Sequence, residues 1–448
     1  MWNLEAFMLA PPSAPSFVFR VLLLLLLLAS PALAQTDPAN PPTQPPATAV
    51  SSSQSSPGSP PPLAPDGFLR EPLFLSTGID FMIDKFGNGD GEPESGFYPE
   101  LSNMITGAGW VSAGPGYRQY LLDRHLLLDG SAAVSWRLYK MVQGHIELPD
   151  LANDRLTVGA QVMWQDHTQV NYFGIGSDSL DSDQSHYRMQ STDVVGYASV
   201  RPRDWLAIDG TFGWLPEPKL MAPGGTFKGD FPDSRVFFPT DPAASLARQP
   251  DFLHGGVAVT ADTRDDHGRP TSGGRYRAAL TTYSDRTTSI FSFRQYEAEA
   301  TQFVPLADRR WVLAFRGWAV LSDVAPGHEI PFYLLPSLGG HNTLRDYHNF
   351  QFHDRNALVV NAESRWAVFT HLDAAVFFDA GNVAAAARQL NLDKTSYGAG
   401  LRVHTERATI ARFDVATGAQ GWQIMFRTSD PFRLSRGRRH VAAIPFTP

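Results

Sequence analysis

The feature of this sequence that most constrains its fold is an alternation of apolar and polar residues with a period of two. The alternation is clear in the segments 257–264, 275–280, 311–316, 358–368, 372–379, 397–404, 411–416 and 422–427. Successive side chains of a β-strand point to opposite faces of a sheet, so these segments predict strands. One face is apolar, rich in aromatic residues and free of charge, and the charges lie on the other face. A soluble sandwich requires only the alternation, whereas a wall between lipid and a polar lumen also requires this separation of charge.

The lengths of the connections support the same architecture. After a long loop between Ser322 and Asn356, the links are short at Thr370, long over 384–394 and short again over 405–407. Transmembrane barrels alternate short periplasmic turns with longer outer loops in this way. We therefore predict an all-β fold, an about 16-stranded antiparallel transmembrane β-barrel with both termini in the periplasm. Five strands are expected after the long loop and about eleven before it, and those between Leu73 and Tyr172 are the hardest to delimit.

The composition excludes several classes of protein. Charged residues make up 18% of the 448 residues, against about 25% in typical globular proteins, so part of the surface is expected to face something other than water. The net charge of −8 removes the electrostatic driving force of nucleic-acid binding, and no nucleic acid is expected as a partner. The absence of Cys excludes disulfides, thiolate zinc sites and cysteine nucleophiles.

The first 65 residues differ in character from the remainder. Arg20 precedes the apolar run 21–29, and the small residues at 32–34 resemble a cleavage site, which predicts a signal peptide over 1–34. A transmembrane anchor would need roughly 18 to 20 apolar residues, about twice the length of this run. Residues 35–65 contain ten Pro and a single charge, which predicts a disordered linker. The barrel is expected over 66–432 and a basic C-terminal tail over 433–448.

Short motifs recur along the predicted barrel in a distinctive order. They are Asn171-Tyr172-Phe173-Gly174-Ile175-Gly176, Asp262-Thr263-Arg264-Asp265, Pro270-Thr271-Ser272-Gly273, Leu338-Gly339-Gly340, Leu344-Arg345-Asp346-Tyr347, Asn361-Ala362-Glu363-Ser364-Arg365 and Phe377-Phe378-Asp379-Ala380-Gly381. Their order and spacing resemble those of the bacterial surface antigen family. Its superfamily includes the central subunit of the barrel assembly machinery and the two-partner secretion transporters. The resemblance implies a protein of the bacterial outer membrane that aids insertion or translocation of other proteins.

The resemblance also implies a contact inside the lumen. In the family, the region that corresponds to 338–354 is an outer loop that folds back into the barrel, where its Arg-Gly-Phe/Tyr tip meets acidic residues of the wall. Arg345 and Tyr347 match this tip, although Asp346 stands where the family usually has Gly, which predicts a changed loop position or a pair within the loop. The period of two independently places Glu363 and Asp379 on the inner face. A guanidinium can engage two carboxylates at once, and the alternative for Arg345 is a solvated loop charge.

A seam between the first and last strands is the functional element that the family resemblance implies. Weak pairing there would admit nascent strands or disorder the local lipid. The last strand is predicted over 421–428 and includes Gly421 and Trp422. Phe432 matches the aromatic residue with which these barrels commonly end, although sixteen residues follow it here.

The expected partners follow from the same resemblance. Family members that insert or secrete proteins usually carry periplasmic substrate-binding repeats before the barrel, and the linker 35–65 is too short for one repeat. Client proteins or a separate periplasmic repeat protein are therefore the expected protein partners. Outer-membrane lipid and lipopolysaccharide are the expected surroundings of the wall.

Two other functions remain open. The first is a passive pore or small-solute channel with the same barrel, whose lumen would be lined by Arg402, Arg412, Asp414 and Arg427. The second is an outer-membrane enzyme, which is disfavoured because no nucleophile and base can be paired from the sequence. No enzymatic activity and no cofactor are therefore expected.

Metal sites have little support in the sequence. Three histidines share the long loop, but no regular spacing preorganises them, and two acidic runs lack the spacing of a calcium loop. A metal site is therefore disfavoured at the histidines His341, His348 and His353. The acidic runs are expected to be solvated turns: Asp178, Asp181 and Asp183; Asn88, Asp90 and Glu92.

Overall fold

The computed structural model describes residues 67–70, 72, 95–102, 112–225, 229–306, 309–404, 409–427 and 432. The predicted signal peptide (1–34), linker (35–65) and basic tail (433–448) lie outside the described residues, as do Asn88, Asp90 and Glu92. Residues Asp66–Pro448 form one compact unit, and the fold below is that of this unit. Within its described part, no helix is both long and apolar enough to cross a bilayer.

Sixteen antiparallel strands, counted over the described residues, form one continuous ladder. They are β1 (Gly96–Ser102), β2 (Ser112–Leu121), β3 (Leu126–Ser135), β4 (Lys140–Asp150), β5 (Leu156–Tyr172), β6 (Ser185–Arg203), β7 (Leu206–Leu215), β9 (Phe252–Asp262), β10 (Gly273–Asp285), β11 (Phe293–Leu306), β12 (Trp311–Val324), β15 (Asn356–Phe369), β16 (Leu372–Ala384), β17 (Lys394–His404), β18 (Thr409–Gly418) and β19 (Gly421–Arg427). This confirms the predicted fold class, with five strands after the long loop and eleven before it.

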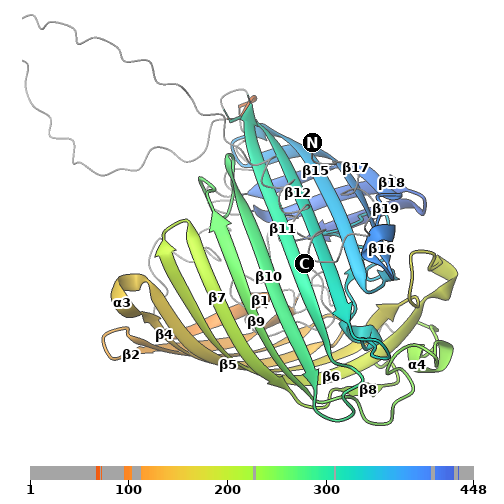
Figure 1. The fold of residues 1–448 in the computed structure, drawn as a ribbon. Coiled ribbons are helices and arrows are strands. Elements are labelled where there is room, and N and C mark those ends of the chain that lie inside the picture. Colours follow the sequence, from red (N-terminus) through yellow and green to blue (C-terminus); the bar gives the residue numbers. More distant parts are fainter. Residues whose placement is uncertain are drawn as a thin grey trace, which may run out of the picture. The chain divides into compact units, whose positions relative to one another are not determined.

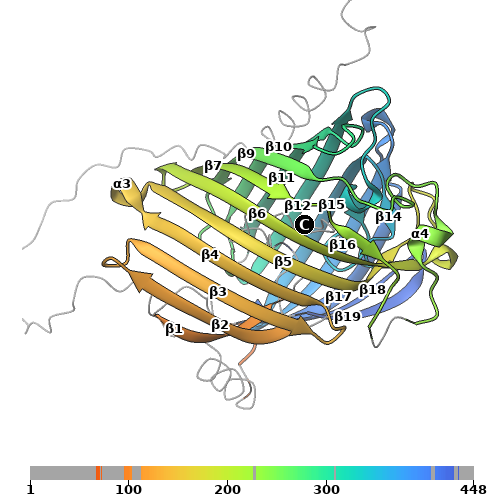
Figure 2. The same cartoon turned by 90° about the horizontal axis from the view of Figure 1, so that it is seen from below.

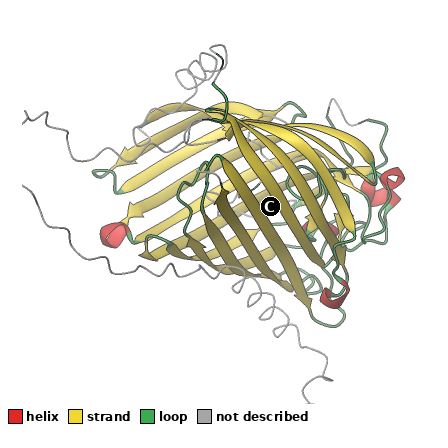
Figure 3. Cartoon of the chain, turned by 90° about the horizontal axis from the view of Figure 1, so that it is seen from above, coloured by secondary structure: helices red, strands yellow, loops and turns green. Residues whose placement is uncertain are grey.

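The remaining elements are short and lie at the ends of the strands. The strand β8 (Lys219–Met221) extends β6 beyond β7, and β13 (Ser337–Leu338) pairs with β14 (Phe352–His353) in a separate small sheet. Single turns of helix are α3 (Leu151–Asp154), α4 (Ser234–Phe237), η2 (Asp181–Asp183), η3 (Phe332–Leu334) and η4 (Ala387–Gln389). Figure 3 shows these helical turns beside a wall made almost wholly of strands.

The ladder curls into a barrel wall with two different ends (Figures 1 and 2). We call the end with the short β15–β16 link, Thr370 and His371, the turn end. The other end, which carries the β12–β15 loop (325–355) and the β16–β17 link (385–393), is the loop end. This alternation of short and long links agrees with the prediction from the sequence.

The two faces of the wall carry the two halves of the sequence alternation. Along β15, the residues Val359, Asn361, Glu363 and Arg365 are buried on the inner face, and the residues between them face outward. The strands β16, β17 and β18 repeat this order, with buried Asp379, Arg402 and Asp414 on their inner faces. Because the charged side chains all turn inward, the outer surface of these strands suits lipid.

The strands β5 and β6 have 17 and 19 residues, well above the roughly ten that cross a membrane at the usual tilt. The last eight residues of β5 are nearly all buried on both faces. The turn 136–139 covers part of this stretch, since Thr168 donates to the carbonyl oxygen of Arg137 at 2.9 Å. With both faces covered, the residues need not alternate, which explains why strands in this region were hard to delimit from the sequence.

The core of the molecule lies inside the barrel rather than between layers. The largest apolar cluster gathers aromatic side chains from the turn 136–139 and from β5, β6, β9, β10, β11 and η3, among them Tyr139, Tyr172, Tyr187 and Phe332. A second cluster packs Leu338, Leu344 and Phe352 of the long loop against β12, β15 and β16. The long loop therefore fills the lumen, as the family resemblance implied.

Candidate functional site

Arg345 lies at the centre of a buried ionic cluster on the inner wall. The side chain is 2% exposed. Its Nε and Nη2 atoms donate to the two oxygens of Asp379 at 2.8 and 2.7 Å, and its Nη1 atom donates to Glu363 at 2.5 Å. This fork engages two carboxylates at once, which a Lys ammonium could not do with the same geometry. The predicted contact of Arg345 with Glu363 and Asp379 is present, and the alternative of a solvated loop charge is wrong.

The wall holds Arg345 by more than charge. The aromatic ring of Phe377, on the inner face of β16, lies 3.5 Å from the guanidinium carbon. The backbone N–H of Arg345 donates to the hydroxyl of Ser396 at 3.0 Å. Asn361 and Ser396 also donate to Asp379, at 2.8 and 3.0 Å, so that this carboxylate is saturated with donors. The loop tip is thus fixed by β15, β16 and β17 together.

Glu363 connects the loop tip to the rest of the cluster. Besides Arg345, it accepts from Arg402 at 3.0 Å and from Arg365 at 2.8 Å. Asp414 pairs with Arg402 and lies 3.2 Å from Nε of Arg412. Four guanidinium groups and three carboxylates therefore form one buried network, with one positive charge in excess.

The predicted lumen-lining residues all lie on the inner face, but they do not line open space. Arg402, Arg412 and Asp414 are at most 1% exposed. Arg412 donates to the carbonyl oxygen of His341 at 3.1 Å, and Arg427 contacts the ring of His341, so the loop covers both arginines. These residues hold the loop in place and do not form the wall of a free channel.

Tyr347 and Asp346 have roles other than ion pairing with Arg345. Tyr347 packs in the second apolar cluster, with its ring 5.0 Å from that of Phe352. Asp346 turns toward the β18–β19 turn and accepts the backbone N–H of Gln420 at 2.8 Å. A Cβ atom at Gly418 would lie 2.7 Å from the Asp346 carboxylate, so this glycine makes room for it. The acidic residue at the tip therefore ties the loop to β18 and β19.

The three histidines of the loop do not converge. His341 contacts Arg427, His348 lies 2.8 Å from Asp181, and His353 packs edge-on against Tyr172 at 5.1 Å. Among the described residues no group of three His, Asp or Glu side chains is arranged to hold a metal ion. The described residues thus offer no arrangement for the metal site that was considered from the sequence.

Because His353 is buried in the docked loop, we expect docking of the long loop in the lumen to depend on pH. Burial lowers its pKa to about 3, so the docked loop keeps this ring neutral where a released loop would protonate it. Above a pH of about 6.5, the ordinary pKa of His, the ring is neutral in both states and the free energy of docking does not change. Below it, docking becomes less favourable by about 1.4 kcal/mol per pH unit, until the docked ring is itself protonated at about pH 3. We expect proteolysis of the loop to rise between pH 7 and pH 4.5. The rise should be smaller in His353→Phe, and equal rises in the two proteins would contradict the prediction. Comparing the two proteins matters because burial raises the pKa of the neighbouring Asp354 and acts in the opposite direction.

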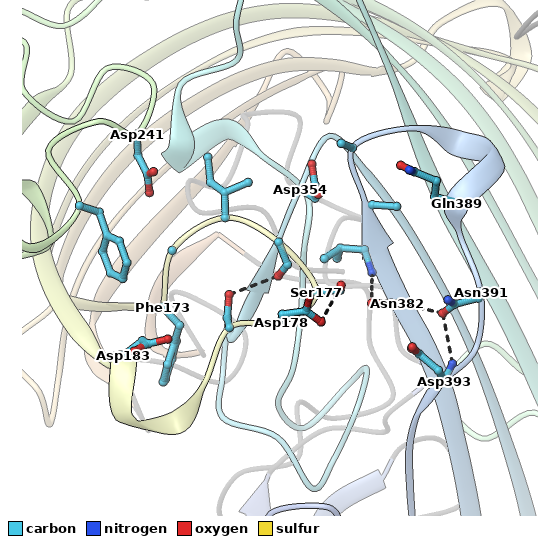
Figure 4. Close-up of a pocket in the computed structure, with 18 residues that line it drawn as sticks. Phe173, Ser177, Asp178, Asp183, Asp241, Asp354, Asn382, Gln389, Asn391 and Asp393 are labelled. Atoms are coloured by element: carbon cyan, nitrogen blue, oxygen red, sulfur yellow. Dashed lines mark hydrogen bonds between the residues drawn. The ribbon is translucent and has the colours of Figure 1, made fainter.

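A pocket of about 620 Å³ lies at the loop end, between the β5–β6 link, the β16–β17 link and the long loop (Figure 4). Its charged lining residues are all aspartates: Asp178, Asp183, Asp241, Asp354 and Asp393. Burial raises the pKa of Asp241 and of Asp354. Acidic groups alone therefore supply the charge of the pocket lining. Of the acidic run considered for calcium, Asp178 and Asp183 line this pocket, and Asp181 pairs with His348 instead.

The seam predicted from the family lies between β1 and β19, the two ends of the ladder. The strand β1 pairs with β2, and β19 pairs with β18. Over the described residues of β1 and β19, no pairing joins these two strands to each other. The outward side chains of these strands are unusually bare: Phe97 is 86% exposed and Trp422 75%. In the interior of the ladder, Leu401 is 44% exposed and Phe212 is 66% exposed. Gly421 and Trp422 lie on the last strand of the ladder, and their part in a seam stays a prediction.

Phe432 requires a correction, because the assignment of this residue to the seam strand is wrong. The strand β19 ends at Arg427, and Phe432 lies on the inner wall at the turn end, 5% exposed. It packs there with Phe303, Val312 and Ala314. The aromatic that faces outward near the end of this strand is Phe426.

The comparisons with known proteins agree with this geometry. The sequence matches the Omp85 superfamily domain over residues 147–423, which is more than half of the chain. The chain belongs to the Omp85 superfamily. It is accordingly a β-barrel protein of the bacterial outer membrane.

Solved structures share the fold at low sequence identity. BamA from Haemophilus ducreyi lacking POTRA domains 1-3 is 14% identical with a TM-score of 0.55, and the alignment covers 75% of this chain and 70% of that one. CdiB from Escherichia coli is 14% identical, with a TM-score of 0.45 and coverage of 75% and 60%. CdiB from Acinetobacter baumannii is 13% identical, with a TM-score of 0.42 and coverage of 70% and 56%. A search of curated proteins found no match.

Several residues of the cluster were not predicted from the sequence. Asn361 and Arg365 lie two positions either side of Glu363, so the alternation placed them on the same inner face without indicating a contact. Phe377 and Ser396 were likewise on inner faces. The sequence feature that could have identified these residues is a polar or aromatic side chain on the inner face of the strands that carry Glu363 and Asp379, or of the strand next to them.

Proposed function

We propose that this Omp85 protein aids the insertion or translocation of polypeptides at the outer membrane, and that the β1–β19 seam is where a client strand enters. The observation that carries the proposal is the seam itself. Its two strands have seven residues each, and both carry bare apolar side chains on their outer faces. An unpaired strand edge is costly in lipid and is a template for pairing with another strand.

The filled lumen favours this function over a passive pore. The long loop contacts Arg412 and Arg427 and buries the ionic cluster around Arg345. In a solute channel the charged residues of the wall would face water. In this barrel the loop covers them. The cluster also offers no free acid or base, since its carboxylates and guanidinium groups are paired with one another, which supports a role without covalent chemistry.

The orientation in the membrane is part of the proposal. Most links at the turn end are short, and the longest links, those between β7 and β9 and between β12 and β15, lie at the loop end. Outer-membrane barrels place short turns in the periplasm, so the turn end would face the periplasm and β19 would run inward. Clients, or a separate periplasmic protein that carries them, would then approach the turn end, close to the seam.

Closing the seam with a disulfide tests the proposal directly. The protein has no cysteine, so engineered pairs have no background. We would combine Phe97→Cys with Trp422→Cys, Ile424→Cys or Phe426→Cys and choose the pair that cross-links on oxidation. In proteoliposomes supplied with an unfolded outer-membrane barrel, oxidation of this pair is expected to reduce client folding to the level of protein-free liposomes. Reduction is expected to restore it.

A matched control cross-links two strands away from the seam. Leu401 and Phe413 are register partners on the outer face of β17 and β18, and a Leu401→Cys, Phe413→Cys pair should leave client folding unchanged. Full client folding with the seam closed would overturn the proposal. A steady conductance from the reconstituted protein, combined with normal assembly of other barrels in cells depleted of it, would support a passive pore.

A further inference from the structure

The site of Phe432 is a formed recess on the inner wall. Its floor is made by Phe303 of β11 and by Val312 and Ala314 of β12. The rings of Phe432 and Phe303 meet edge to face, with centroids 6.3 Å apart. On another side the guanidinium of Arg365 lies 5.0 Å from the centre of the Phe432 ring. An apolar floor with a cation over the ring face is a favourable site for an aromatic side chain.

The position of this recess relative to the seam is unexpected. Phe432 is five residues beyond the end of β19 at Arg427, a stretch that can span at most about 17 Å. The recess belongs to β11, β12 and β15, and the strands β16, β17 and β18 separate β15 from β19. Because only four residues separate Arg427 from Phe432, the end of β19 is tethered to this part of the inner wall. A strand whose end is anchored in the lumen is restrained from moving outward into the membrane.

Arg365 also links this anchor to the tip of the long loop. Its Nε atom donates to one oxygen of Glu363 at 2.8 Å, and the other oxygen of Glu363 accepts from Arg345 at 2.5 Å. The ring of Phe432 is thus connected to the loop tip through its contact with Arg365 and through two buried ion pairs, Arg365–Glu363 and Glu363–Arg345. A displacement of Arg365 would therefore disturb both the seat of Phe432 and the carboxylate that holds the loop tip.

We propose that Phe432 is an internal latch. Seated in the Phe303–Val312–Ala314–Arg365 recess, it holds the end of the seam strand β19 inside the lumen, and its release allows the seam to open. The effect of the latch on clients rests on the proposed function, whereas the contact of Phe432 with its recess can be measured separately. The occupant of the recess is the chain's own Phe432, and opening the seam requires the recess to be vacated.

Cross-linking tests the contact independently of any activity. In the otherwise cysteine-free full-length protein, Phe432→Cys with Ala314→Cys is expected to form a disulfide under mild oxidation, in detergent and in liposomes. Leu127, a buried residue of β3 near the same end of the barrel, provides the control partner. Phe432→Cys with Leu127→Cys should not cross-link. Equal cross-linking of the two pairs, or none with Ala314→Cys, would overturn the latch.

Seam opening provides the second measurement. Loss of a buried aromatic ring that stacks on a cation is expected to shift the latch toward release by about tenfold. Phe432→Ala should therefore increase the rate of client folding and the frequency of conductance openings. The matched control Phe378→Ala removes an aromatic from the lipid-facing side of β16, away from the seam, at 47% exposure, and should change neither. Phe432→Trp should keep the latch closed.

Locking the latch separates its failure from that of the proposed function. The oxidised Phe432→Cys, Ala314→Cys pair should suppress client folding and conductance openings, and a reductant should restore both. If the disulfide forms and both readouts stay at the wild-type level, the latch does not control the seam and the proposal is wrong. If the wild type folds no client while the lock still abolishes conductance openings, the latch stands and the proposed function fails.

Discussion

Replacing Arg345 with Ala is expected to lower the free energy of unfolding by about 3–5 kcal/mol, the usual cost of removing one partner of a buried ion pair. The substitution leaves Asp379 and Glu363 buried without the fork that joins them, and it removes the cation from the ring of Phe377. The loop should then leave its site on the inner wall. The folded fraction that resists heating in detergent, and the resistance of the loop to protease, measure the two consequences.

The loop offers its own control for Arg345. Arg355 lies on the same loop with its side chain exposed, and Arg355→Ala should leave both measurements unchanged. Arg345→Lys should recover little, because a single ammonium cannot make the paired hydrogen bonds to Asp379. Unchanged heat resistance together with unchanged loop proteolysis in Arg345→Ala would contradict the role assigned to this residue.

Replacing Glu363 with Gln is expected to have an effect of similar size, about 3–5 kcal/mol, for a different reason. Glu363 is the carboxylate shared by Arg345, Arg365 and Arg402. Its neutralisation raises the excess positive charge of the cluster and leaves three guanidinium groups to repel one another in a site shielded from water. The urea midpoint of unfolding and the proteolysis of the loop should both report the loss.

Two further variants sharpen the test of Glu363. Glu217→Gln removes a carboxylate from the pair of Glu217 with Arg248, which is solvated, and should have little effect. Glu363→Gln combined with Arg402→Gln removes one charge of each sign and should be less damaging than the sum of the two single changes. An additive result would mean that the two groups do not interact, contrary to their separation of 3.0 Å.

The inner and outer faces of the wall could be predicted residue by residue. On β15 to β18 the alternation assigned Glu363, Asp379, Arg402 and Asp414 to the inner face, where the structure finds them. This succeeded because one face meets lipid and cannot carry charge, so that the two faces must differ in composition. It failed at the loop end of β5, where neighbouring loops cover both faces and the composition no longer differs.

The partners of each inward residue could not be predicted in the same way. Asp346 stands next to Arg345 in the sequence, which suggested a pair within the loop, yet it caps the turn at Gln420. Phe432 matched the end of a strand by its position in the chain, yet it lies against Phe303 and Arg365. These contacts join segments far apart in the sequence, and only the path of the chain in space decides which of them form.

For this protein, the sequence determined the approximate number of strands and the face of each strand, because lipid, lumen and turns each impose a local rule on residue type. The loop tip was located by the resemblance of its motif to the family. The tertiary structure decided which inward groups meet, how far the loop fills the lumen and where Phe432 packs. Those outcomes depend on the closest approach of side chains from different strands, where a difference of one or two ångströms separates an ion pair from two solvated charges.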